Sequence, residues 1–268
     1  MHLTLSRDPV SGDEQLELTA PAFPEDWQNE LALAAANTAR AVLGDSPNVE
    51  SAAELARAVM AGASRLIDTL LARVPAGTVA CQAGCDHCCH QSVGLTPPEA
   101  LAIHDHLRAS RSPEQFAALA ARVGALRAKT RGLSTDERFS PQYPCLFLEG
   151  GRCSIYEVRP LACRGMNALD AEDCARRLRD PVVRAQFLAR GSGGTSFMEP
   201  IRTFHALSAG LQLGLADLYG LDMRPLDLVA AMDLLLNGPE TISDGWSRGE
   251  PAFEPAVGGG ISPPKSAS

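Results

Sequence analysis

The sequence predicts a mainly α fold, in which a helical scaffold surrounds a loop-rich, cysteine-bearing region that contains a short β-hairpin. Ala and Leu recur throughout the chain, whereas aromatic residues make up only 5 % of it. This composition favours helices that pack through small and unbranched side chains. Several stretches repeat apolar residues at helical spacing. All eight cysteines lie between positions 81 and 174, so one part of the chain departs from the helical pattern.

Residues 1–24 form the first segment. They alternate polar and apolar groups without a sustained period, and Pro21 and Pro24 interrupt them. We therefore expect a loose or weakly paired N-terminal lead.

A helical extension is expected over residues 25–77. Its first helix runs to Gly44, a residue type that commonly follows the last helical residue. Its second helix spans about residues 49–74 and ends before Pro75. These helices form a packing unit without evident chemistry.

Two further helices lie within the cysteine-bearing region. Thr96 starts the first of them, because Pro97 fits the first helical position and Glu99 completes a capping box. This helix continues to about residue 110, and another follows over residues 112–131.

Residues 133–166 change character, because prolines, glycines and aromatic residues occur there without a helical period. Two short strands are expected on either side of a three-residue turn with Gly150 at positive φ, which would place Cys145 opposite Cys153. Such a segment needs an external constraint to become ordered. We expect residues 78–180 to form one metal-binding domain.

The chain returns to helix after the last cysteine, and residues 181–240 are expected to pack on the cysteine domain. One long helix is marked by an apolar face: Phe204, Leu207, Leu211 and Leu218. The last helix spans about residues 226–236 and ends at Asn237 and Gly238. Residues 241–268 are rich in Gly, Pro and Ser, so we expect a disordered tail.

Charge and hydropathy exclude several classes of protein. The formal charge of -8 opposes phosphate binding, so nucleic acid is not an expected partner. No run approaches the roughly 18 apolar residues of a spanning helix, and the N-terminus lacks the pattern of a secretory signal. We expect a cytoplasmic protein without a membrane partner. Structural disulfides do not persist in a reducing cytosol, so the cysteines need another explanation.

The first cluster comprises Cys81, Cys85, Cys88 and Cys89, within the sequence CQAGCDHCCH. Steps of four and three residues would bring the first three thiols to one face of a helix. Gly84 would instead open a turn whose amides face the sulfur atoms. Adjacent side chains diverge, so Cys89 could serve a second metal, bridge two metals or stay a reactive thiol.

The second group comprises Cys145, Cys153, Cys163 and Cys174. Thiolates bind zinc and iron–sulfur clusters, and four of them around either leave a net negative charge. Three arginines lie near these cysteines in the sequence: Arg152, Arg159 and Arg164. They could compensate the negative charge or pair with Glu149 and Glu157 at the surface, and both interpretations stand.

Histidine also binds zinc and iron, and His87 and His90 lie inside the first cluster. Either could replace one thiolate. With eight cysteines available, we interpret them as groups that support the site or as exposed loop residues.

The pattern CxxxCxxCC, the pair Pro144-Cys145 and the segment CSIYEVRPLACR from Cys153 resemble the YkgJ family of cysteine-cluster proteins, which is described as zinc- or iron-chelating. The family motif is often written CxxCxxCC, and here the first gap is three residues. The resemblance covers roughly residues 78–180 and implies that all eight cysteines are ligands. Related clusters occur in flagellin lysine methylases, so it also makes a protein-modification enzyme or its partner conceivable.

Three functions remain open. The first is a metal-binding protein that supports a redox or protein-modification process. An iron–sulfur cluster is favoured over zinc or iron ions, because one tetrahedral zinc cannot use so many adjacent cysteines. The second is a radical enzyme, because Cys81, Cys85 and Cys88 have the spacing that binds a [4Fe-4S] cluster with S-adenosylmethionine. Such an enzyme should have a barrel of alternating strands and helices after these cysteines, but the sequence there predicts helices and an irregular loop.

The third is a thiol redox or metal-delivery protein in which Cys88 and Cys89 stay reactive. No set of catalytic residues stands out, so enzyme activity is not assigned. Any protein partner or substrate is likewise not identified.

Overall fold

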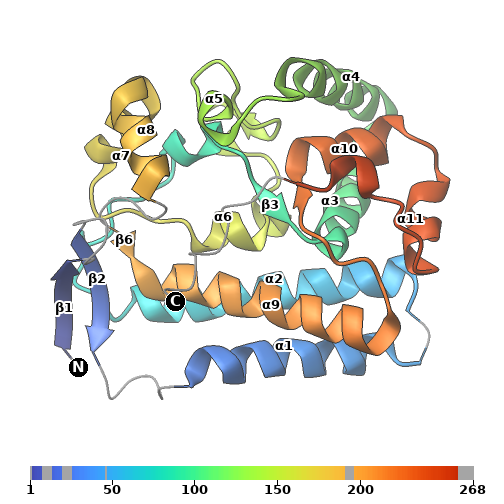
Figure 1. Ribbon diagram of the computed structural model, residues 1–268, viewed down its shortest axis with the longest axis horizontal. Helices are drawn as coiled ribbons and strands as arrows, with labels where there is room; N and C mark the ends of the chain where they lie inside the picture. The colour runs from blue at the N-terminus through green and yellow to red at the C-terminus, as the bar shows by residue number, and fades with distance from the viewer. Residues whose placement is uncertain (1, 8–13, 20–25, 46, 191–195, 259–268) are drawn as a thin grey trace.

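The computed structural model describes residues 2–7, 14–19, 26–45, 47–190 and 196–258 and confirms the mainly α fold class (Figure 1). Its helices are α1 (Trp27–Leu43), α2 (Val49–Leu71), α3 (Pro97–Ser110), α4 (Pro113–Thr130), α5 (Thr135–Arg138), α6 (Leu161–Gly165), α7 (Ala171–Arg179), α8 (Pro181–Arg190), α9 (Met198–Tyr219), α10 (Leu228–Asn237) and α11 (Thr241–Ser247). Three 3-10 turns join them: η1 (His87–His90), η2 (Tyr156–Val158) and η3 (Glu254–Ala256). The strands are β1 (His2–Arg7), β2 (Glu14–Thr19), β3 (Gly94–Leu95), β4 (Leu148–Glu149), β5 (Arg152–Cys153), β6 (Ser196–Phe197) and β7 (Leu226–Asp227).

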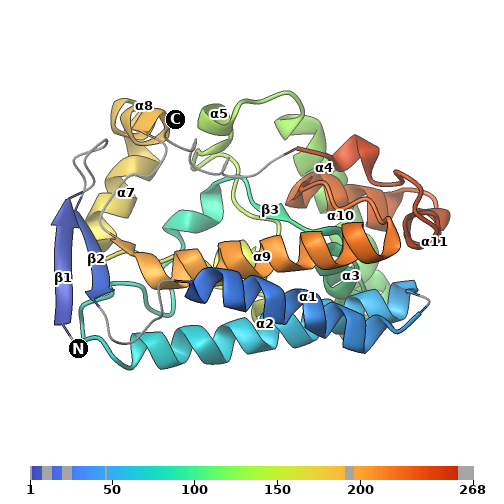
Figure 2. The ribbon, with the colours of Figure 1, turned by 60° about the horizontal axis from the view of Figure 1, so that its bottom comes forward.

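The long helices α1, α2 and α9 form one layer along the length of the molecule (Figure 2). Glycines allow α9 to approach α1 closely. A Cβ atom at Gly214 would lie 3.0 Å from Cα of Ala36, and one at Gly210 would overlap the carbonyl oxygen of Ala32. The apolar faces of all three helices join a single buried core.

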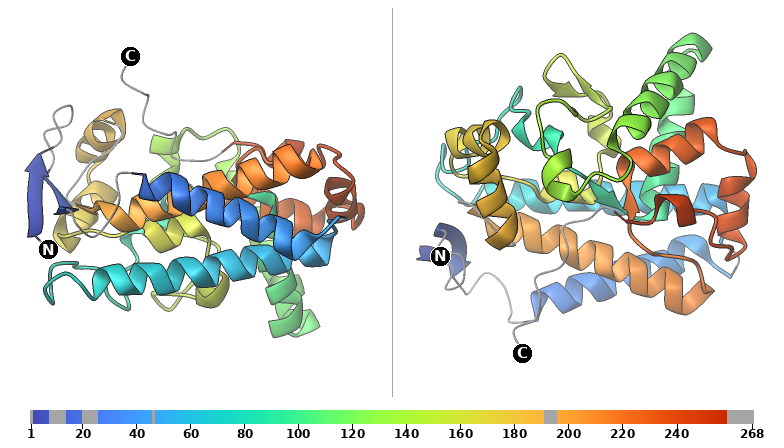
Figure 3. Two further views of the ribbon diagram at one scale, coloured as in Figure 1. Left: turned by 90° about the horizontal axis from the view of Figure 1, so that it is seen from below. Right: turned by 45° about the horizontal axis from the view of Figure 1, so that its top comes forward.

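The second layer covers this one and carries the cysteines (Figure 3). α3, α4 and α10 pack together at one end, and α7 and α8 lie at the other. The short helix α6 packs on α9 and α2 between the two ends. The cysteine-bearing segments are therefore supported from below by the long helices.

The predicted start of α3 is confirmed, and it does more than cap the helix. Glu99 is 1 % exposed, and one of its carboxylate oxygens accepts hydrogen bonds from the Thr96 amide and hydroxyl, each at 2.8 Å. The other oxygen accepts the amide of Leu161 at 2.7 Å. Because Leu161 begins α6, this one carboxylate ties two helices of the cysteine region together.

Residues 2–7 and 14–19 of the predicted loose lead form an antiparallel pair of strands, β1 and β2. β2 also pairs in parallel with β6, so that Gln15 lies opposite Ser196. The polar–apolar alternation of the lead is thus the alternation of paired strands.

The expectation of a disordered tail is wrong for residues 241–258. α11 and η3 fold back on the core, and Trp246 and Phe253 are 0 % and 1 % exposed. The Trp246 indole donates to the Asp222 carbonyl at 2.8 Å. These two aromatic side chains bury enough apolar area to order the segment, although its average composition is rich in Gly, Pro and Ser. The remaining residues of the predicted tail, 259–268, lie outside the described residues.

Candidate metal centre

The first cysteine cluster lies on an irregular segment between α2 and β3. Gly84 has φ of 94°, which turns the chain between Cys81 and Cys85. Cys88 and Cys89 then fall on η1. The sequence allowed either a helix face or a turn at Gly84, and the structure has the turn.

The predicted hairpin forms, but with another register. Leu148, not Cys145, pairs with Cys153, and the loop consists of Gly150 and Gly151, both at positive φ. Two adjacent glycines permit the two-residue turn that matches the twist of a hairpin, so the expected three-residue loop is wrong. Cys145 lies before the hairpin, where its amide donates to the carbonyl of Cys89 at 2.6 Å.

The hairpin and the neighbouring helices bring the two cysteine groups together. The turn residue Gly151 faces the carbonyl of Gly84, 4.0 Å from where its Cβ atom would be. Cys163 lies on α6 and Cys174 on α7. The segment before the first cluster is joined to the α6–α7 connection by a hydrogen bond from the Ala80 amide to the Ala168 carbonyl, 2.8 Å long.

Electrostatic coupling divides the thiols into two sets that meet at Cys88. One set interacts among itself: Cys81, Cys85 and Cys174. The second set also interacts among itself: Cys145, Cys153 and Cys163. Cys88 contributes to the thiol pKa in both sets, and its own thiol is hydrogen-bonded to Cys89.

Burial raises the pKa of most of these thiols. Desolvation raises the pKa of Cys145 to about 11 and that of Cys174 to about 12. It raises the pKa of Cys163 well above the ordinary range, with the neighbouring thiols adding to the effect. The pKa of Cys88 is also raised well above that range, first by the hydrogen bond with Cys89 and then by desolvation of the sulfur atom, although the residue as a whole is exposed to solvent. Without a metal, these thiols keep their protons at neutral pH.

Backbone amides oppose this effect at individual sulfur atoms. The pKa of Cys81 is raised by burial but lowered by a hydrogen bond from the backbone of Ala168. The backbone of Phe147 acts in the same way on Cys145, and that of Ile155 on Cys153. Such N–H groups stabilise negative sulfur, as the surroundings of metal-bound thiolates do.

Of the three arginines that lie near the cysteines in the sequence, Arg159 acts on the largest number of thiols. Its charge lowers the pKa of thiols in both sets, including Cys81 and Cys163. Its guanidinium lies over the Tyr156 ring, 4.3 Å from the centroid. Glu157 contacts an arginine through its backbone carbonyl, which accepts a hydrogen bond from Arg164.

The other arginines have structural or surface positions. Arg164 also donates to the Arg159 carbonyl and the Ser64 hydroxyl, and it is 5 % exposed. Arg152 is exposed. Glu149, expected as a partner for these arginines, instead pairs with Arg111 and Arg122.

Sequence reasoning missed Arg138. It is 5 % exposed, donates to the Tyr143 carbonyl and lowers the pKa of Cys145. Arg138 belongs to no recognisable motif, and only the fold brings it to the second set of thiols.

Buried polar atoms without a partner gather in the same region. Within the described residues, they include Nδ1 of His90, Oγ of Ser154 and Nε of Arg159. Buried polar groups are normally paired, and an unpaired one points to a missing ligand, ion or water. These atoms lie on the segments that carry the cysteines, so the donor set fits a bound metal or cluster.

The sulfur atoms do not form a ready coordination shell. Across the described parts of the chain, no three His, Cys, Asp or Glu side chains are close enough together to hold a metal ion as they stand. All eight cysteines are free thiols. The thiols thus lie within electrostatic reach of one another, and metal binding requires them to lose protons and move closer.

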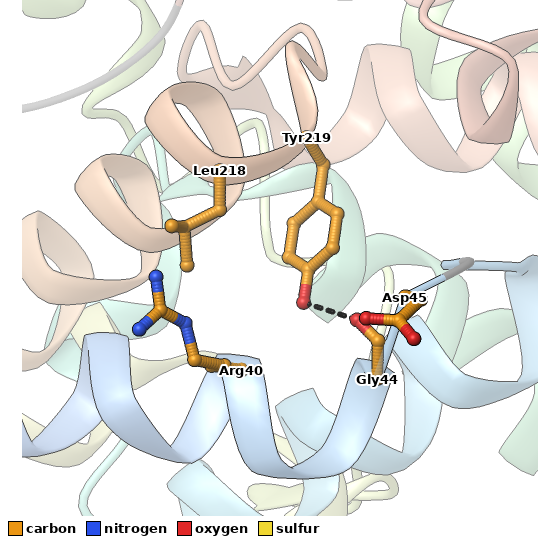
Figure 4. A pocket seen from close by; sticks show the side chains of 5 residues that line it. All are labelled: Arg40, Gly44, Asp45, Leu218 and Tyr219. Atoms are coloured by element: carbon orange, nitrogen blue, oxygen red, sulfur yellow. Dashed lines mark hydrogen bonds between the residues drawn. The ribbon is translucent and has the colours of Figure 1, made fainter.

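The hollows on the surface of the long-helix layer carry no comparable chemistry. One lies between the ends of α1 and α9 and is lined by Arg40, Gly44, Asp45, Leu218 and Tyr219 (Figure 4). The Tyr219 hydroxyl donates to the Gly44 carbonyl at 2.7 Å and is thereby satisfied. A second, apolar hollow lies between α1 and α2. Neither contains a cysteine.

Two structural features define the class of this protein. The helical scaffold carries eight free thiols, and charged and amide groups that stabilise thiolate lie around several of them; both features are typical of cysteine-cluster proteins. Residues 80–179 match the model of the CxxCxxCC family, described as "Putative zinc- or iron-chelating domain". This match confirms the resemblance of residues 80–179 to a cysteine-cluster family.

No curated protein and no solved structure matches the chain. Among the helices of the described residues, none is long and apolar enough to cross a membrane.

Proposed function

We propose that this protein holds an iron–sulfur centre, or zinc or iron ions, through its eight cysteines in two sets that share Cys88 and Cys89. The observation that carries this proposal is the electrostatic division of the thiols, in which Cys88 is coupled to both sets. Each set of three needs a fourth ligand to complete a four-coordinate site. In this proposal, the adjacent Cys88 and Cys89 supply it.

An iron–sulfur centre is the favoured form. Eight thiols are twice the number that one tetrahedral zinc uses, and a cluster accepts four thiolates from separate segments. Arg159 supports either form, because a guanidinium keeps its proton beside thiolates and compensates their negative charge. When bound, a cluster would supply electron transfer, whereas zinc would supply structural order.

The surroundings of Cys88 do not favour a reactive-thiol function. Its raised pKa keeps it protonated at neutral pH, and nucleophilic cysteines have lowered pKa values. A radical enzyme is also less supported, because the described strands are short and make no barrel alternating with helices. A redox or protein-modification role for the metal centre in a reducing compartment such as the cytoplasm stays part of our proposal.

The deciding experiment is elemental analysis of anaerobically purified full-length protein, combined with visible absorption and electron paramagnetic resonance spectra. We expect iron with inorganic sulfide and broad visible absorption. One or two equivalents of zinc in a colourless protein would replace the iron–sulfur form by the zinc form. Protein that holds neither metal after reconstitution with each would refute the proposal.

Substitution of single cysteines tests the ligand set. Cys85→Ser, Cys145→Ser and Cys163→Ser should each lower the metal content, and they should make residues 133–166 more sensitive to protease. Cys88→Ser and Cys89→Ser form a matched pair, because the two residues are adjacent on one turn. If Cys89→Ser keeps full metal and Cys88→Ser does not, only Cys88 is a ligand.

A further inference from the structure

Asn167 lies in the connection between α6 and α7, four residues after Cys163, and its side chain joins this connection to β6. Its Oδ1 atom accepts the Phe197 amide at 2.8 Å, and its Nδ2 atom donates to the Phe197 carbonyl at 2.8 Å and to the Gly165 carbonyl at 3.0 Å. The Ser196 hydroxyl donates to the backbone carbonyl of Asn167 at 3.2 Å. An asparagine side chain has two N–H donors and one carbonyl acceptor, so both donors and the acceptor are used here.

Phe197 is the buried partner in this contact. It lies in β6, beside β2 and directly before α9 (Figure 1). It is 0 % exposed and forms a second, smaller apolar cluster with Leu70 of α2. Partly buried residues that pack against this cluster include Val79 and Leu169.

The same cluster supports the segment that enters the cysteine region. The Ala80 amide donates to the Ala168 carbonyl at 2.8 Å. Val79 precedes Ala80 and Leu169 follows Ala168, so apolar contacts hold the chain on both sides of this hydrogen bond. Cys81 is the next residue after Ala80. Its backbone is therefore fixed to the residue that directly follows Asn167.

The α6–α7 connection also leads into the helix that carries Cys174. This helix, α7, packs against the η1 turn of the first cluster. By contrast, α6 has a separate tie, because its first backbone amide donates to the Glu99 carboxylate of α3. Asn167 thus holds the approaches to Cys81 and Cys174, whereas Cys163 on α6 has independent support.

We propose that Asn167 and Phe197 are positioning residues for the first set of thiols, which bring Cys81 and Cys174 to a common metal without contacting it. Phe197 lies outside residues 80–179, so a residue beyond the family domain acts on the metal site inside it. This inference rests on the proposed function and adds to it the residues on which the first set depends.

Coupling between this contact and the metal acts in both directions. If the contact of Asn167 with Phe197 favours metal binding, bound metal favours the contact by the same factor. Metal loading should therefore slow hydrogen exchange of the Phe197 amide, which donates to Asn167, by about 10- to 100-fold. Nuclear magnetic resonance of the full-length wild-type protein, with and without zinc, measures this effect and does not depend on whether a variant folds.

A second experiment follows the individual thiols. Full-length protein is loaded with zinc under anaerobic, reducing conditions, or reconstituted with iron and sulfide if it takes up no zinc. Accessible thiols are then alkylated with iodoacetamide and located by mass spectrometry of peptides. In Asn167→Ala, Cys81 and Cys174 should react about 10-fold faster than in the wild-type protein or faster still, whereas the thiols of the second set should stay protected. A general loss of stability would expose both sets alike.

Asn237 provides a control that also joins two segments through its side chain. Its Nδ2 atom donates to the Ala120 carbonyl and to the Asp233 carboxylate, each at 2.9 Å, and so ties α10 to α4. Neither of these helices contains a cysteine. Asn237→Ala should therefore keep the wild-type pattern of alkylation. Asn167→Asp keeps the size of the side chain and the acceptor but loses both donors, so it should show the pattern of Asn167→Ala in weaker form.

Three results would overturn the inference while leaving the proposed function intact. The first is equal alkylation of Cys81 and Cys174 in loaded Asn167→Ala and wild-type protein. The second is equal exposure of both thiol sets in Asn167→Ala, and the third is hydrogen exchange of the Phe197 amide that metal does not change. A wild-type chain that takes up neither zinc nor iron would overturn the proposed function together with this inference.

Discussion

Replacement of Glu99 should both destabilise the fold and lower its metal content. The buried carboxylate accepts three hydrogen bonds, from the Thr96 amide and hydroxyl and from the Leu161 amide. Leu161 begins α6, which carries Cys163. In Glu99→Ala, the two backbone N–H groups lose their acceptor in the interior, and α6 loses its link to α3.

The size of the effect follows from those contacts. Each buried donor left without an acceptor costs about 1–3 kcal/mol, whereas the Thr96 hydroxyl can rotate to another partner. Part of this cost is offset, because burial raises the pKa of Glu99 and the carboxylate is itself expensive to bury. We therefore expect a loss of about 3 kcal/mol from the free energy of unfolding, a large fraction of the roughly 5–15 kcal/mol of a typical protein.

Glu137 is a matched control. It accepts the Ser134 amide at 2.8 Å and hydroxyl at 2.7 Å in the same kind of capping box, but it is exposed and accepts no third hydrogen bond from the part of the chain that the structure describes. Loss of an exposed cap costs about 1 kcal/mol. Urea unfolding followed by far-ultraviolet circular dichroism, with metal analysis of the same samples, compares Glu99→Ala with Glu137→Ala. Equal destabilisation and equal metal content in the two variants would refute the link between α3 and α6.

Three further predictions concern the scaffold, the charge at the site and the protons that metal displaces. Gly210→Ala should destabilise the protein by about 1–3 kcal/mol, because the new methyl overlaps a carbonyl of α1. Gly62→Ala should stabilise it by up to about 1 kcal/mol, because there the methyl meets only the end of the Arg65 side chain, at an ordinary van der Waals distance of 3.9 Å. A stabilised Gly210→Ala in the same denaturation assay would contradict the observed α1–α9 contact. Arg159→Gln should weaken metal retention about 10- to 100-fold in a competition with a chelator, whereas Arg152→Gln should leave it unchanged. Equal losses in the two variants would show that Arg159 does not compensate the thiolate charge more than Arg152 does. Metal binding should release protons, because the raised pKa of Cys145 keeps that thiol protonated at neutral pH. The metal affinity should therefore weaken as pH falls, by about tenfold per pH unit for each displaced thiol proton. An indicator-dye titration that detects no proton release would exclude thiols as ligands.

The helices were predictable because their signals are local. Gly44 ends α1 at positive φ, and Thr96, Pro97 and Glu99 mark the start of α3. Such caps depend on residues within one turn of each other, so the sequence contains all the required information. The hairpin register was harder, because Gly150 and Gly151 together permit a shorter turn than one glycine alone.

The C-terminal region shows where local composition fails. Gly, Pro and Ser are frequent in it, but Trp246 and Phe253 are buried, and α11 packs on α10 and on α2, which lies far away in the sequence. Burial of a few large side chains can order a segment whose average composition is polar, and no local pattern reveals which surface they will meet.

The sequence by itself determined the helical fold class and the thiol chemistry, because both depend on residue type and short spacing. Only the tertiary structure divided the thiols into two sets around Cys88, selected Arg159 as their broadest counter-charge and left Nδ1 of His90 bare in the interior. Coupling, burial and pairing arise between segments distant in sequence. They depend on where the backbone places each side chain, which spacing along the chain does not determine.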